Sequence, residues 1–159
     1  MTDFSEMARE IIESNRYMVL GTADEAGVPW VTPVWFAHSE HRRFLWVSSP
    51  DRRHSANVAA RPEVSIVIFD STVAESDARA VYMAGRAEQV PDADLERDLA
   101  RYDAVSRAQG PGRRWTAEDV LAPAPYRLYR ATASRHWVLD PDSSPDARAE
   151  VTMETGAAD

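Results

Sequence analysis

The chain has 159 residues and carries 18 basic against 26 acidic side chains, which gives a formal net charge of −8. A chain this acidic lacks the basic face that binding to a nucleic-acid backbone needs, so we expect no nucleic-acid partner. It contains no cysteine, which excludes disulfides and thiolate metal sites and is compatible with the cytoplasm.

The length fits one folded domain with a sizeable core, which we place in residues 1–140. Residues 141–159 are acidic and poor in apolar side chains, so we expect a disordered tail there. Residues 1–17 lack the pattern of a secretion signal, and no later apolar run approaches membrane-spanning length. We therefore expect a soluble, cytoplasmic protein with no membrane partner.

An amphipathic helix is predicted first. Asp3 followed by Glu6 resembles a capping box, and apolar side chains then recur at helical spacing up to Ser14. Residues 17–22 predict a strand, and Gly27 predicts a hairpin turn because glycine readily adopts positive φ.

The second strand is predicted at residues 30–37 and contains Pro33. Proline cannot donate a hydrogen bond to a neighbouring strand, so this position predicts a sheet edge or a bulge. Main-chain groups that are freed in this way can bind a ligand. The alternative is the rim of a barrel that binds nothing.

A third strand at residues 44–49 leads into a helix that Ser49 and Pro50 are expected to open, as N-cap and first residue. Three consecutive basic side chains follow: Arg52, Arg53 and His54. The partial positive charge of a helix start disfavours them, and such a local conflict indicates a functional site. Free amides, serine hydroxyls and guanidinium groups together predict a phosphate site. The alternative is that the arginines point to solvent and His54 packs at the edge of the helix.

The remaining elements complete the predicted fold. They are strands at residues 64–69 and 80–90, the second with Gly85 as a bulge, a helix at 92–109, one helical turn within 116–121, and a closing hairpin of 126–133 and 135–139. Many short strands at even spacing favour an antiparallel barrel over a doubly wound sheet.

Two histidines lie in the polar turn before the third strand. His38 and His41 have no further ligand at a spacing typical of zinc sites, so we expect no metal site.

Three pieces of the sequence keep a characteristic order and spacing. They are the strand at residues 31–36, the segment 48–58 followed by Arg61-Pro62-Glu63-Val64, and the strand at 79–88, which ends in a glycine and then a small residue and a glutamate, the glutamate three positions after the glycine. Together they resemble the pyridoxamine 5'-phosphate oxidase-like, flavin-binding split-barrel family over most of residues 17–139.

This resemblance implies a mainly β (α+β) fold, a six-stranded antiparallel split β-barrel with flanking helices. It also implies a homodimer with one FMN in each of two clefts between the subunits. In such proteins a serine or threonine and a basic pair hold the FMN phosphate. These positions correspond here to Ser48 or Ser49 and to Arg53 and His54, in agreement with the phosphate site predicted above. The strand around Pro33 borders the isoalloxazine through main-chain groups. The candidate cofactor-binding residues are Thr32, Pro33, Val34, Trp35, Ser48, Ser49, Arg53, His54 and Asn57.

The sequence departs from the oxidase pattern at several points. His54 stands where the basic pair often has lysine, Thr32 where the oxidase has a phosphate-binding arginine, and Ala80 where it has a glutamine that reaches the flavin. The substrate-gripping C-terminal segment is also missing, which argues against vitamin B6 oxidation. We expect an FMN-dependent oxidoreductase that acts on a small molecule by hydride transfer. The alternatives are a deazaflavin-dependent reductase, or a non-catalytic protein that binds flavin or haem.

Overall fold

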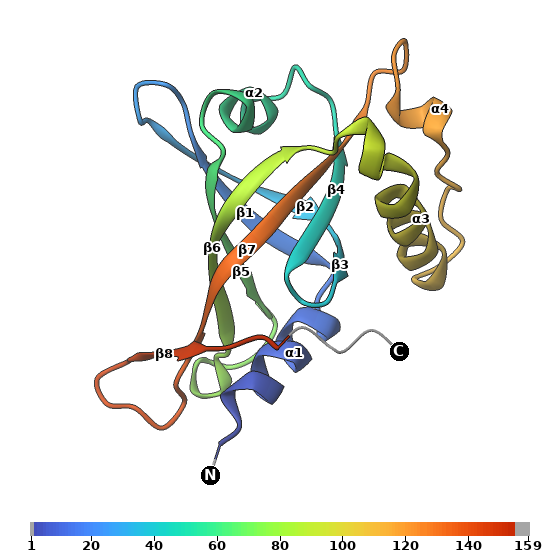
Figure 1. The fold of residues 1–159 in the computed structure, drawn as a ribbon. Coiled ribbons are helices and arrows are strands. Elements are labelled where there is room, and N and C mark those ends of the chain that lie inside the picture. Colours follow the sequence, from blue (N-terminus) through green and yellow to red (C-terminus); the bar gives the residue numbers. More distant parts are fainter. Residues whose placement is uncertain (1, 155–159) are drawn as a thin grey trace.

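A computed structural model describes residues 2–154 of the chain. Its body is one antiparallel sheet that curls into a barrel (Figure 1), with strand order β2-β1-β5-β6-β7-β4-β3 and β8 added to β7. The strands are β1 (Tyr17–Ala23), β2 (Pro29–Trp35), β3 (Ala37–Ser39), β4 (Arg43–Ser48), β5 (Glu63–Phe69), β6 (Ala80–Gln89), β7 (Arg127–Leu139) and β8 (Arg148–Val151). The predicted antiparallel split barrel is confirmed, with eight strands in the described residues instead of six.

The helices flank this barrel. They are α1 (Phe4–Ser14), α2 (Arg53–Ala60), α3 (Asp92–Ala108), α4 (Ala117–Val120) and a short 3₁₀ helix, η1 (Glu75–Asp77). Asp3 caps α1 as predicted, since its carboxylate accepts hydrogen bonds from the amides of Ser5 and Glu6. Figure 1 shows α1 and α2 at opposite ends of the barrel and α3 beside β3 and β4. Within the described residues, no helix is both long enough and apolar enough to cross a membrane.

Strand β4 contributes to two apolar clusters. Phe44 and Trp46 are buried inside the barrel, in a cluster that also includes the inner face of α1. Leu45, between them, is buried on the opposite face, in a second cluster with Leu99 and Tyr102 of α3. Burial on both faces therefore explains the continuous apolar run of this strand.

The closing hairpin predicted at residues 126–133 and 135–139 is wrong, because these residues form the single strand β7. The pairing with β6 shifts at Gly85, and Ser134 is left without a partner residue opposite it. This extra residue is a β-bulge, which bends a strand without reversing it. The sequence therefore predicted the position of the bulge at Gly85 correctly, but not that β7 continues through it as one strand.

The tail also differs from the expectation of disorder. Arg148–Val151 forms β8 and pairs with the end of β7. Val151 and Met153 are buried in the barrel cluster beside α1, so this polar segment docks through two apolar side chains as well as through its pairing with β7. Residues 155–159 lie outside the described residues, and the domain boundary at residue 140 stays a prediction.

Replacing Gly85 with alanine should lower the free energy of unfolding by about 1–3 kcal/mol, the usual range for overpacking. A Cβ atom at Gly85 would lie 2.3 Å from the main-chain oxygen of Thr132, and main chain cannot rotate away. Urea unfolding measures the change. Ser134→Ala at the exposed bulge is the control and should stay near the wild-type value. An equal loss in both variants would contradict the steric explanation.

Candidate functional site

The first turn of α2 has no side-chain cap. The helix begins at Arg53, three residues later than predicted, because Ser49 and the residues after it form a separate turn. In that turn the amide of Arg52 donates to the carbonyl oxygen of Ser49 at 3.2 Å, and the Ser49 hydroxyl accepts from the amide of Asp51 at 3.3 Å. The Ser49 hydroxyl is therefore engaged within this turn and does not cap the helix. Arg52 is the N-cap residue, and its side chain makes no capping hydrogen bond. Uncapped amides at a helix start are suited to bind an anion.

His54, the second residue of α2, is joined to the last residue of β4. Its Nε2 atom lies 2.9 Å from the hydroxyl oxygen of Ser48. Burial, with a smaller contribution from the charge of Arg52, lowers the pKa of His54 below its usual value. The imidazole is therefore mainly neutral near pH 7 and becomes charged more readily when an anion is bound beside it.

Arg53 provides a permanent positive charge at the same place. Its guanidinium lies over the ring of Trp30, 4.5 Å from the ring centroid, so the side chain is held against β2 by a cation–π interaction. Trp30 was not among the predicted site residues. The sequence carries one signal for it, a large aromatic side chain on the same face of the strand as Thr32 and Val34.

A further polar group lies in this turn. The hydroxyl of Ser55 is buried and has no hydrogen-bond partner in the described part of the chain. Buried polar atoms are nearly always paired in folded proteins. An unpaired one in the first turn of α2, beside uncapped amides, fits a site that is completed by a ligand.

Strand β2 lies at one edge of the sheet, as Pro33 predicted, and pairs with β1 on one side. Its last two side chains, Val34 and Trp35, are engaged within the protein, whereas Trp30, Val31 and Pro33 are exposed. Val34 is buried in the barrel, while Trp35 packs edge-on against Tyr102 and donates to Gln109 at 3.1 Å. A ligand along this edge would therefore meet main-chain groups more than the side chains of Val34 and Trp35. The role of Thr32 to Trp35 in cofactor binding stays a prediction.

Asn57 has a different environment from the other candidates. Its side-chain amide is buried and donates to the hydroxyl of Thr22 at 3.0 Å. This hydrogen bond ties α2 to β1. The structure thus brings Ser48 and His54 together, places Arg53 of the same helical turn against Trp30, and gives Asn57 a contact that holds the helix in place.

Comparison with known proteins shows a clear relationship. The family model described as pyridoxamine 5'-phosphate oxidase matches residues 4–139. No curated protein matches the sequence.

Three solved structures share the fold. A heme binding protein from Mycobacterium smegmatis superimposes with a TM-score of 0.72 at 19% identity, covering 94% of this chain and 59% of that protein. A FAD-binding protein from Mesorhizobium loti gives 0.64 at 20% identity, covering 82% and 90%. HutZ, the heme storage protein from Vibrio cholerae, gives 0.60 at 19% identity, covering 84% and 92%. This chain therefore spans less than two thirds of the mycobacterial protein.

Asn57→Ala should lower the free energy of unfolding by about 1–3 kcal/mol, because it leaves a buried hydroxyl without this donor. A double-mutant cycle with Thr22→Val tests the contact, with urea unfolding as the measurement. We expect the double variant to lose less than the sum of the single variants, because both remove the same hydrogen bond. Strict additivity would show that the two side chains do not interact.

Proposed function

Because this chain belongs to the pyridoxamine 5'-phosphate oxidase family, we propose that it is an FMN-dependent oxidoreductase that acts on a small molecule by hydride transfer. The observation that carries the proposal is the uncapped start of α2, with Arg53 and the Ser48–His54 pair beside it. These groups supply amides, a fixed positive charge and two further polar side chains to one phosphate.

The residues of this site fit a flavin phosphate in number and kind. Ser48, Arg53 and His54 would hold the phosphate, and the unpaired hydroxyl of Ser55 supplies one more polar group in the same turn. The exposed edge of β2 around Pro33 would border the ring system with its main chain. FMN, when bound, supplies the hydride chemistry, so the side chains need only position the cofactor and exclude water.

A second copy of the chain would complete this cleft. Tyr17 of β1 and Trp30 and Val31 of β2 are 61%, 40% and 65% exposed. An open groove of about 620 Å³ continues from Val31 across the outer face of the sheet to Gly85 and Ser134. Tyr17 and Val31 lie on the same face of the sheet, because Val31 pairs with Gly21 and Tyr17 lies four residues before Gly21 on β1. Exposed apolar side chains on one face are typical of protein interfaces. These surfaces support a homodimer with the cofactor at the subunit interface.

Two other functions remain candidates. A protein that binds flavin or haem without turnover is supported by the fold shared with the M. smegmatis and V. cholerae haem proteins. A deazaflavin-dependent reductase of the same fold is the other candidate, because the departures at Thr32 and His54 weaken the match to the FMN-binding oxidase pattern. The absorbance of the purified protein distinguishes these functions. Flavin bands support FMN and a Soret band supports haem. A colourless protein that binds added deazaflavin supports the deazaflavin-dependent reductase.

Replacing both Arg53 and His54 with alanine should weaken FMN binding about 10- to 100-fold or more, because charge-assisted hydrogen bonds to the phosphate are lost. Fluorescence titration of FMN measures the change, and circular dichroism checks that the barrel is folded. Arg61→Ala is the matched control, since it removes one positive charge immediately after the other end of α2, where Arg61 donates to the carbonyl of Glu25. Unchanged affinity in a folded double variant would refute the phosphate site.

The affinity for FMN should rise as the pH falls from about 8.5 to about 6.5. The lower limit of this range is close to the usual pKa of histidine. The pKa of His54 is lowered in the free protein, and a neighbouring phosphate raises it in the complex, so binding takes up a proton. Titrations stop at about pH 6.5 because the phosphate itself titrates near 6. In His54→Asn the affinity should change much less over this range. Equal pH profiles in the two proteins would exclude a role for this imidazole.

A further inference from the structure

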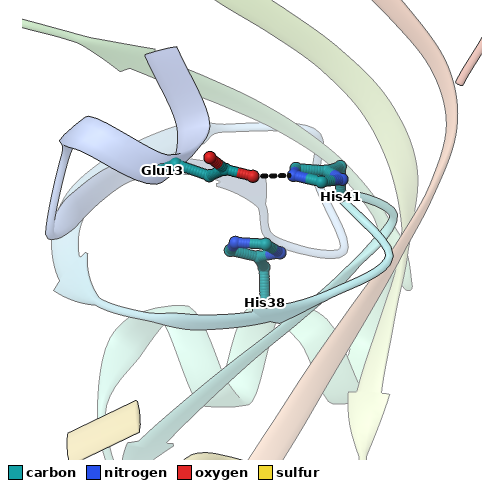
Figure 2. Close-up of side chains that lie close together, drawn as sticks. All are labelled: Glu13, His38 and His41. Atoms are coloured by element: carbon teal, nitrogen blue, oxygen red, sulfur yellow. Dashed lines mark hydrogen bonds and ion pairs between the residues drawn. The ribbon is translucent and has the colours of Figure 1, made fainter. Parts of the chain in front are cut away.

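A cluster of three ligand-type side chains lies at the end of the barrel near α1. Figure 2 shows Glu13 from α1, His38 from β3 and His41 from the turn between β3 and β4. Oε1 of Glu13 lies 2.7 Å from Nε2 of His41, and the two imidazole rings are stacked with centroids 4.6 Å apart. One ligand atom from each of the three residues lies within 4.8 Å of the others. It is the one such group of three found in residues 2–154.

We propose that Glu13, His38 and His41 bind a divalent transition-metal ion, for which Zn²⁺ is the probe. The sequence predicted no metal site, because the two histidines have no third ligand at a suitable spacing. The third ligand comes from α1, which is distant in sequence and is brought to the hairpin by the fold.

The turn that presents His41 has an unusual backbone. Its amide-to-carbonyl hydrogen bond joins Arg42 to Ser39 at 3.2 Å, and the two residues between them, Glu40 and His41, have φ of 56° and 54°. Two-residue hairpin turns of this kind favour asparagine and glycine, and a side chain such as glutamate is strained there. Backbone strain of this kind is concentrated at functional sites. Here the turn carries His41 to a position over the ring of His38.

His38 has a nitrogen that is available for a metal. Its Nδ1 atom is buried without a hydrogen-bond partner in the described residues. The neutral imidazole ring is the form in which histidine most commonly binds metal ions in proteins.

The donor set selects the class of ion. Two imidazole nitrogens and one carboxylate oxygen suit Zn²⁺ and its transition-metal neighbours, whereas Mg²⁺ prefers oxygen ligands. Two histidines with a glutamate also form a catalytic type of zinc site, in which water occupies the fourth position. The Glu13 side chain is 59% exposed, so the site is open to water.

Binding requires the three side chains to move closer together. Zinc ligands lie about 2.0–2.2 Å from the ion, so the stacked rings must tilt and Glu13 must swing inward. Glu13 is exposed and can move. The positive charge of Arg101, whose Nε atom donates to the carbonyl oxygen of His38 at 2.7 Å, opposes the ion. We therefore expect weaker binding than at a closed structural zinc site.

This site is separate from the phosphate site. His41 precedes β4, whereas Ser48 ends it, so the strand places the two sites roughly 20 Å apart along its length. A bound ion would join α1 to the β3–β4 hairpin. It would therefore stabilise the fold without touching the cofactor cleft.

Calorimetric titration of Zn²⁺ into the chelator-treated full chain tests the proposal, with Mg²⁺ as the comparison ion. We expect one Zn²⁺ per chain, no binding of Mg²⁺, and a higher thermal midpoint with Zn²⁺, because ligands of the native state stabilise it. Glu13→Gln and His41→Asn should each weaken Zn²⁺ binding at least about tenfold. Asparagine adopts positive φ readily, so His41→Asn keeps the turn and the fold.

Glu10→Gln is the matched control. Glu10 lies on the same helix, its side chain is also 59% exposed, and it pairs with Arg79 instead of a histidine. It should bind Zn²⁺ as the wild type does. Zn²⁺ affinity unchanged in Glu13→Gln and His41→Asn, an equal loss in Glu10→Gln, or no stoichiometric binding by the wild type would overturn the proposal. FMN titration of His41→Asn keeps the two sites distinguishable, because it should match the wild type.

Discussion

Burial of β4 on both faces is the constraint on which both candidate sites depend. Phe44 and Trp46 anchor the strand in the barrel, and Leu45 anchors it against α3. A strand packed on both sides cannot shift its register without exposing one set of these side chains. Its ends are therefore held firmly. One end carries Ser48 of the proposed phosphate site, and the other adjoins the turn that carries His41.

The start of α2 shows how a local cost can serve binding. The first amides of α2 receive no hydrogen bond from a capping side chain, because the N-cap residue is Arg52. Loss of a cap typically costs about 1 kcal/mol. The packing of α2 offsets it, since Val58 enters the barrel and Asn57 bonds to Thr22. Stability thus comes from the inner face of the helix, which leaves its first turn for an anion.

The fold and part of the geometry of the proposed phosphate site could be predicted from the sequence, because their signals are local. Asp3 marked the start of α1, Pro33 the edge strand and Gly85 the bulge. Basic residues after Ser49 marked the start of the helix for which we propose phosphate binding. The errors have a physical cause as well. The Ser49 hydroxyl bonds within a separate turn, so α2 begins later than predicted. At Ser134 the chain forms a bulge within one strand where a hairpin was predicted.

Sequence alone determined the class of fold and the kind of ligand suited to the start of α2, since periodicity, proline and charge act within a few residues. Tertiary structure alone decided which distant side chains meet. It placed the ring of Trp30 against the guanidinium of Arg53 and directed the side chain of Asn57 towards Thr22 in the protein interior. It also brought Glu13 close to His38 and His41. Such contacts depend on how strands and helices pack, and no spacing along the chain encodes them.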